Sequence, residues 1–202
     1  MKLEDFCADR FDARTYLTKP FPIGNYLVAS NGHWMAFIPT LVDCESDDIP
    51  AQPRKVISEL ISMNESVEFT PIPAFETPSP ETCTTCKGDG NSETKLCHEC
   101  DGDCYVSAEN QYSTYNNLEC KSCDGKGYIT TTETDVDCEK CSGKGTAYST
   151  KNPIDIDGLS MNPNYLVRVA NLPNVKISIN TDRCIMLFKS DSLSGCVMGM
   201  AS

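Results

Sequence analysis

The sequence has little of what nucleic-acid-binding proteins and most enzymes carry. It contains 2 histidines, and its 17 lysines and arginines stand against 29 acidic residues, which gives a formal net charge of −12. A Ser/His/Asp order, a phosphate-cradling glycine loop and a metalloprotease helix are all missing from it. Because a chain this acidic is repelled by phosphate backbones, we expect no direct nucleic-acid binding through general electrostatics. We also expect no enzymatic activity.

Long apolar runs are missing too. No stretch of the sequence approaches the length needed to cross a membrane. The opening residues MKLEDFCADRFDAR mix acids with arginines and lack the apolar core of a signal peptide. In such a chain, 13 cysteines favour reduced, metal-binding thiols over disulfides. We therefore expect a cytoplasmic protein that is not embedded in a membrane.

What the sequence does have is a series of Cys-x-x-Cys pairs. Two cysteines three positions apart on a turn can bind the same ion, and a structural zinc ion takes four such ligands in a tetrahedron. Eight cysteines in four pairs therefore predict two closed sites, with two Zn²⁺ as the cofactors. Spacing alone leaves open which pairs share an ion. The pairs are Cys83 and Cys86, Cys97 and Cys100, Cys120 and Cys123, and Cys138 and Cys141.

Glycines follow each pair at regular positions. A chain that wraps around a metal needs positive-φ positions, which glycine occupies at the lowest cost. The same segment is poor in Leu, Ile, Val and Phe. Its folding free energy therefore has to come largely from metal, which supplies on the order of 10–16 kcal/mol in zinc-finger peptides. The glycines are Gly88, Gly90, Gly102, Gly125, Gly127, Gly143 and Gly145.

The four copies, CTTCKGDG, CHECDGDC, CKSCDGKG and CEKCSGKG, resemble the Cys-x-x-Cys-x-Gly-x-Gly repeat of the zinc domain of DnaJ-type chaperones. The second copy departs from the repeat at Cys104, which stands where the family has glycine; we interpret this cysteine as a local substitution and not as a ligand. The resemblance implies a bent β-hairpin arm in which the outer pairs share one ion and the inner pairs share the other. Zinc 1 would be bound by Cys83, Cys86, Cys138 and Cys141, and zinc 2 by Cys97, Cys100, Cys120 and Cys123.

Both flanks of this segment show helix and strand patterns. The runs NYLVA and HWMAFIP, joined at Asn31-Gly32, predict a β-hairpin up to Pro39. PRKVISELISM predicts a helix with Pro53 in its first turn, and ESVEFT at 65–70 predicts a half-buried strand. Asn162 and Pro163 have the character of an N-cap and a first-turn proline, and predict a helix through Ala170. Strands are expected around 175–179, 184–188 and 195–200.

Neither flank is large enough to bury a core alone. We therefore expect an α+β fold in which residues 1–72 and 152–202 form one discontinuous body. The zinc-binding arm at 83–146 is then an insertion. The proline-rich stretch at 71–82 resists both helix and sheet, and is expected to be a linker.

Three short segments of the expected body are similar to bacterial DNA sliding clamps. SNGHWMA at 30–36 is similar to the clamp hairpin Thr-Asp-Gly-His-Arg-Leu-Ala, and MNPNYL at 161–166 to the helix opening Phe-Asn-Pro-Lys-Tyr-Leu. VMGM at 197–200 is similar to the terminal Ile-Met-Pro-Met, with glycine in place of proline. This resemblance implies a clamp-like α/β domain built from two similar halves. A clamp protomer has three such domains, and this chain has room for one.

These observations lead to one favoured function and two alternatives. The DnaJ-type resemblance implies a zinc-binding module that binds a protein partner or unfolded polypeptide in a chaperone-like manner. A J domain with its His-Pro-Asp turn is not found in the sequence, so recruitment of a heat-shock ATPase in the usual way is not expected. The first alternative is a DNA replication accessory with a sliding-clamp-like body. The less favoured second alternative is a thiol–disulfide redox protein, which would need one exposed, low-pKa pair at a helix start.

The remaining candidate residues have structural interpretations. His33 is expected to be a structural or surface residue, and His98 to face solvent. Trp34 is expected in the core or at an interface, and the acid pair at 47–48 in a solvated loop. The cysteines of the expected body are interpreted as small buried hydrophobic residues and not as ligands. They are Cys7, Cys44, Cys184 and Cys196.

Overall fold

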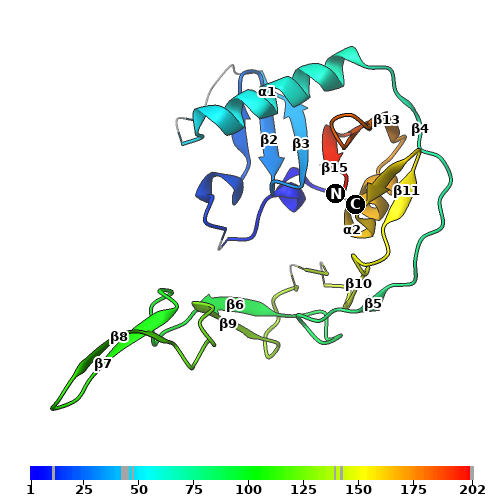
Figure 1. Cartoon of the computed structure of the whole chain (residues 1–202). Coiled ribbons are helices and arrows are strands. Elements are labelled where there is room, and N and C mark those ends of the chain that lie inside the picture. The colour runs from blue at the N-terminus through cyan, green and yellow to red at the C-terminus, as the bar shows by residue number, and fades with distance from the viewer. Residues whose placement is uncertain (11, 42–45, 47, 139, 142, 201–202) are drawn as a thin grey trace. The chain divides into compact units, whose positions relative to one another are not determined.

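The structure, a computed structural model, describes residues 1–10, 12–41, 46, 48–138, 140–141 and 143–200. The chain divides into two compact units (Figure 1). We call the first unit, Met1–Ser79 with Tyr148–Ser202, the body, and the second unit, Pro80–Ala147, the arm. Cys44 and Asp47, which the sequence assigned to the body and to a loop, lie outside the described residues.

The body is built on one antiparallel sheet of seven strands in the order β1-β2-β3-β15-β14-β13-β4. Both ends of the chain contribute to it, because β3 pairs with β15, with Met35 opposite Cys196. This arrangement confirms the α+β class and the joining of the two flanks in one sheet. The strands are β1 (Phe21–Ile23), β2 (Tyr26–Ser30), β3 (Trp34–Pro39), β4 (Thr70–Pro71), β13 (Lys176–Asn180), β14 (Ile185–Lys189) and β15 (Ser194–Met198).

In the described part of the body, two α-helices complete the fold, α1 (Ala51–Ser66) and α2 (Pro163–Ala170). Helix α2 begins as predicted, because the Asn162 side chain accepts a hydrogen bond from the Asn164 N–H at 2.9 Å and Pro163 is the first helical residue. Neither helix among the described residues is long and apolar enough to span a membrane. Smaller elements are the 3-10 helices η1 (Leu3–Phe6) and η2 (Thr15–Leu17), and the hairpin of β11 (Ile154–Ile156) and β12 (Leu159–Met161).

The strand predicted at 65–70 is wrong over most of its length. Helix α1 continues to Ser66, and only Thr70 of the predicted stretch enters a strand. The helix extends this far because Ile57, Ile61 and Asn64, at helical spacing, are buried on one face. Packing of that face overrides the local alternation that suggested a strand.

The core lies on both faces of the sheet. In β3, Trp34 and Ala36 join one buried cluster, whereas Met35 and Phe37 join the other. Helix α2, η1 and the β11–β12 hairpin contribute to the first cluster, and α1 contributes to the second. A strand covered on both sides needs apolar residues at successive positions, which explains the continuous runs WMAF and IMLF.

One buried polar side chain ties α1 to the sheet. The Asn64 amide donates hydrogen bonds to the carbonyl oxygens of Phe188 at 3.1 Å and Gly195 at 3.0 Å. These carbonyls belong to the adjacent strands β14 and β15. The amide therefore bridges two paired strands from one face of the sheet, and its own buried donors find partners there.

The linker between body and arm has no helix or strand at 72–80. It is not free chain throughout, because Ile72 and Phe75 pack against the first core cluster. The proline-rich stretch thus follows the surface of the body before the arm begins.

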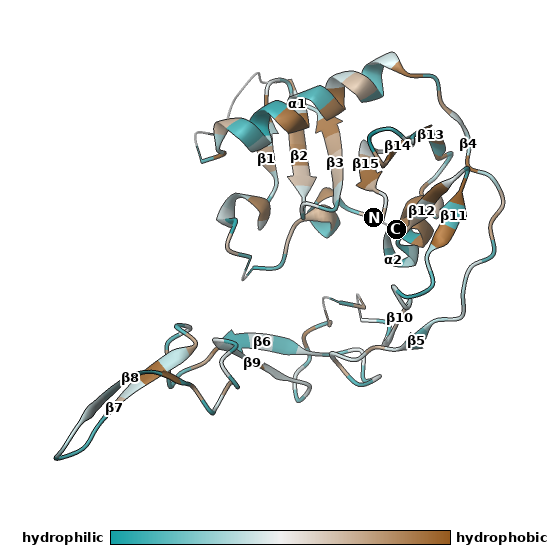
Figure 2. Cartoon of the chain, viewed as in Figure 1, coloured by the Kyte–Doolittle hydropathy of each residue, from teal (hydrophilic) through white to brown (hydrophobic). Residues whose placement is uncertain are grey.

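The arm consists of three nested two-stranded sheets. In order from its ends, β5 (Glu81–Thr82) pairs with β10 (Thr146–Ala147), β6 (Glu93–Leu96) with β9 (Tyr128–Thr131), and β7 (Tyr105–Glu109) with β8 (Thr114–Glu119). Figure 2 shows the contrast with the body: brown, hydrophobic strands in the body and a mostly teal or white arm. Among the described residues of the arm, the buried apolar clusters are two groups of cysteines.

Candidate metal centres

The eight predicted cysteine ligands lie in two separate buried groups of four. Within each group, all sulfur atoms lie within 4.8 Å of one another. The structure brings the outer pairs together and, separately, the inner pairs together, the nesting that the DnaJ-type resemblance implies. The outer centre is Cys83, Cys86, Cys138 and Cys141, and the inner centre is Cys97, Cys100, Cys120 and Cys123.

The sulfur–sulfur distances fit zinc. In a tetrahedral site with Zn–S bonds of about 2.3 Å, the sulfurs stand about 3.8 Å apart, whereas a disulfide would bring them to about 2.05 Å. The Sγ–Sγ distances are 3.9 Å for Cys83–Cys138, 3.7 Å for Cys86–Cys141, 3.7 Å for Cys97–Cys120 and 3.8 Å for Cys100–Cys123. Both groups thus have the donor type, number and spacing for one zinc ion each.

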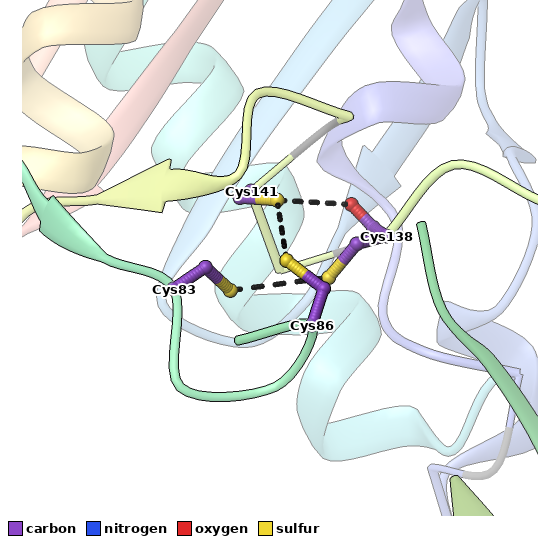
Figure 3. A group of neighbouring side chains, drawn as sticks. All are labelled: Cys83, Cys86, Cys138 and Cys141. Atoms are coloured by element: carbon purple, nitrogen blue, oxygen red, sulfur yellow. Dashed lines mark hydrogen bonds between the residues drawn. The ribbon is translucent and has the colours of Figure 1, made fainter. Parts of the chain in front are cut away.

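Figure 3 shows how the outer centre is assembled. Cys83 and Cys86 come from the turn after β5, and Cys138 and Cys141 from the turn before β10, and the four sulfurs point toward one another. None of the four side chains is more than 5% exposed. Four protein ligands in a buried tetrahedron leave no open position for water or substrate, which is the arrangement of a structural site.

Both centres use the same backbone contacts. In each, the first cysteine of one turn donates its N–H to the carbonyl of the eighth residue of the opposite turn. The bonds are Cys83 to Gly145 at 2.8 Å, Cys138 to Gly90 at 2.7 Å, Cys97 to Gly127 at 2.9 Å and Cys120 to Cys104 at 3.0 Å. The two turns of each centre are therefore related by an approximate two-fold axis, and the repeat in the sequence corresponds to a repeat in structure.

Glycine is required where opposing turns meet most closely. At Gly145, with φ of 70°, an added Cβ would lie 2.3 Å from the Gly88 carbonyl oxygen. At Gly127, with φ of 77°, it would lie 2.5 Å from the Gly102 carbonyl oxygen. A side chain at either position would push the two turns of its centre apart.

Cys104 takes the place of Gly90 in the inner centre. It adopts a φ of 69°, in the left-handed region, and its carbonyl accepts from Cys120 as that of Gly90 accepts from Cys138. Its sulfur lies 3.7 Å from the Gly102 carbonyl oxygen and belongs to neither group of four. The structure thus places Cys104 outside the ligand sets.

Within each centre, hydrogen bonds from backbone N–H groups and from neighbouring thiols give the cysteines different pKa values. Burial raises the pKa of Cys123, but the Gly127 N–H, 3.3 Å from its sulfur, and the adjacent thiols outweigh this and lower the pKa to about 7. Burial and the hydrogen bond with Cys123 raise the pKa of Cys120 to about 12. In the outer centre, the pKa of Cys83 is likewise lowered to about 7 and that of Cys141 raised to about 12. A divalent cation bound in either centre would favour the thiolate form of its cysteines.

The histidines, the tryptophan and the described cysteines of the body lie outside the two centres, at the surface or in the core. His33 and His98 are exposed, and Trp34 is buried in the first core cluster. Cys196 is buried in the second cluster, and burial raises its pKa to about 12. Cys7 and Cys184 are only partly buried, against the first cluster.

Two features, one in the centres and one in the body, were not predicted from the sequence. The first is the pair of N–H groups directed at sulfur, from Gly127 to Cys123 and from Gly145 to Cys141; the last glycine of the repeat was the available signal. The second is an aromatic stack in the body, which has no local signal. Trp34 lies with its ring centroid 4.1 Å from that of Phe6 and 4.8 Å from that of Tyr165, and the Arg168 guanidinium lies over it at 4.9 Å.

Comparison with known proteins found no family model, curated protein or solved structure that matches the chain. The two centres are therefore assigned from the geometry of this chain.

Proposed function

We propose that the chain is a non-enzymatic protein that holds two zinc ions and binds another polypeptide through its arm. The observation that carries the proposal is an arm fixed by two buried cysteine centres that leaves large hydrophobic side chains exposed. An arm that folded only to be stable would not need them at its surface. They are Leu96, Tyr105, Tyr112, Tyr115, Leu118, Tyr128, Ile129 and Val136.

The character of the centres supports a non-enzymatic role. Each centre saturates a tetrahedral ion with four buried thiolates, so the metal contributes folding free energy and offers no site for substrate. The same saturation argues against a dithiol oxidoreductase, which keeps its reactive pair accessible. The resemblance to DnaJ-type zinc domains adds support for unfolded polypeptide as the partner.

An aggregation assay tests this function. The zinc-loaded chain is added to a heat-denatured reporter enzyme, and light scattering is followed with time. We expect the scattering to fall in proportion to added protein, the effect to be lost after zinc is removed with a chelator, and zinc to restore it. An intact, zinc-loaded chain that leaves scattering unchanged would contradict the proposal.

A DNA replication accessory is the second candidate. It is favoured by the similar order of elements in the two parts of the body: β2–β3, α1 and β4 in one, and β11–β12, α2 and β13–β15 in the other. Two similar halves are what the sliding-clamp resemblance implies. Salt-dependent binding to duplex DNA would support this candidate, whereas the net charge of −12 predicts no such binding.

A further inference from the structure

The β7–β8 hairpin has one apolar face. Val106 pairs across the strands with Leu118, and Ala108 with Tyr115, and cross-strand partners share a face. Leu118 and Tyr115 are three positions apart and would face opposite sides of a regular strand. A bulge on β8, where Asn117 has a φ of 58°, keeps them on the same side. The irregularity thus creates a continuous apolar face.

This face is open. Residues 107–119 are all exposed, and Tyr115 and Leu118 are 48% and 40% exposed. Val106, at the base, packs against the inner cysteine centre, so the centre anchors the hairpin. Figure 2 shows a brown stretch in the hairpin, within an arm that is mostly teal or white. Within the described residues β7 and β8 pair only with each other, so each strand has an unpaired outer edge.

The composition of the hairpin is that of a protein-binding loop. Residues 105–119, YVSAENQYSTYNNLE, are dominated by tyrosine, asparagine and serine. Tyrosine gives a large, rigid contact area with little loss of conformational entropy, and asparagine and serine form adaptable hydrogen bonds. Tyr112, in the turn, is 85% exposed.

The charge of the hairpin selects the kind of partner. From Lys95 to Lys121 the sequence has no other lysine or arginine, and it has five acidic residues. Glu109 and Glu119 lie on the face opposite the apolar one, across from Thr114 and Tyr105. Positive side chains are attracted to such a surface and also stack on tyrosine rings, whereas phosphates are repelled. The five acids are Glu99, Asp101, Asp103, Glu109 and Glu119.

We infer that the β7–β8 hairpin binds an extended polypeptide segment in which lysine or arginine alternates with apolar residues. The segment adds as a strand to an open edge of the hairpin, and backbone hydrogen bonds hold it there. Because side chains alternate along a strand, its apolar residues then meet the Val106–Leu118 face and its cations meet the Glu109–Glu119 face. This inference depends on the proposed function and adds the location and chemistry of binding.

The test measures fluorescence anisotropy with the zinc-loaded full chain. The probes are a labelled 12-residue peptide that alternates lysine with valine, the same peptide with glutamate for lysine, and an oligothymidine. We expect binding of the lysine peptide only, weakened by salt. Tyr115→Ser with Leu118→Ser should weaken it at least tenfold, and Glu109→Gln several-fold. Leu41→Ser, a fully exposed apolar residue of the body, and Glu133→Gln are the matched controls, and should leave binding unchanged.

Three results would overturn the inference. They are unchanged binding by a Tyr115→Ser/Leu118→Ser variant that retains two zinc ions, preferential binding of the glutamate peptide or the oligothymidine, and self-association of the chain that the same variant abolishes. If that variant still suppresses aggregation and still binds the lysine peptide, the inference fails while the proposed function stands. If the unaltered chain neither suppresses aggregation nor binds the peptide, both fail.

Discussion

Each cysteine in the two centres depends on the three sulfurs around it. Zinc in a four-cysteine site is held by thiolates, and a serine hydroxyl in the same place does not ionise near neutral pH. Cys104 differs, because its backbone contributes to the inner centre and its sulfur does not. The two kinds of cysteine can therefore be distinguished by substitution.

We predict that Cys97→Ser reduces bound metal from two zinc ions to one per chain, because the inner centre loses a ligand while the outer centre keeps all four. Metal analysis of the purified protein measures this, and near-UV circular dichroism reports whether the body remains folded. Cys104→Ser is the control, and should retain two ions. A Cys97→Ser protein with two ions would mean that the sulfurs are paired differently.

Buried Cys196 should make the body sensitive to alkali. Burial raises its pKa from 9.0 to about 12, so above pH 9 the unfolded thiol ionises while the folded one stays neutral. Stability is therefore full below pH 9 and is lost as the pH rises toward 12, by at most about 1.4 kcal/mol per pH unit. Urea unfolding of the body at several pH values measures the loss, and Cys196→Ala should make it smaller. Cys7, with its pKa raised to about 11 by burial and then by Glu4 and Asp5, contributes in the same direction. An unchanged pH slope in Cys196→Ala would refute this assignment.

At the scale of the element, local signals predicted some parts well. A few adjacent residues determine the Asn31-Gly32 turn between β2 and β3, and likewise the start of α2 at Asn162-Pro163. Both are found where the sequence predicted them. The β11–β12 hairpin also had such a signal, Asp157-Gly158, with φ of 50° and 84°, but it was overlooked. Turns of this kind can thus be predicted from the few residues that form them.

Other parts depend on distant contacts. The end of α1 is set by packing of Ile57 and Ile61 on the sheet, which no local pattern reveals. The cysteine spacing predicts two centres but not their membership, because four similar turns carry the same local sequence. Which turns meet is determined by the nested pairing of the arm strands, and only the family resemblance anticipated it.

Helix α1 gives a prediction at this scale. Asn64→Ala removes both hydrogen bonds to the Phe188 and Gly195 carbonyls, each contributing about 1 kcal/mol, and with them the buried side chain that bridges β14 and β15. We expect the free energy of unfolding of the body to fall by about 2 kcal/mol. Urea denaturation measures it, with Ser66→Ala, an exposed hydroxyl in the last turn, as the control expected to be neutral. Equal stability of the two variants would show that the bridge contributes little.

For the whole molecule, the two units have different sources of stability. The body buries apolar side chains on both faces of its sheet, whereas the buried clusters described in the arm are cysteine centres. Loss of metal should therefore act on one unit alone.

We predict that a strong zinc chelator unfolds the arm and leaves the body folded. Limited proteolysis should then cut within Pro80–Ala147, while the fragments Met1–Ser79 and Tyr148–Ser202 stay associated through the β3–β15 pairing. Size-exclusion chromatography followed by mass spectrometry identifies the fragments, and the zinc-loaded protein serves as the control. Simultaneous loss of both units on chelation would show that the body needs metal as well.

The two ends of the arm, far apart in the sequence, lie side by side in the structure. Glu81 lies opposite Ala147 in the β5–β10 ladder, and the Cys83 N–H reaches the Gly145 carbonyl at 2.8 Å. Because its two ends are adjacent, the module can be inserted without changing the distance between the two host residues that flank it, so it is transferable. Inserted into a surface turn of an unrelated protein, residues 81–147 would keep the β5–β10 pairing that closes the arm. The host protein would gain a domain that folds only with metal, and its own fold would be unchanged.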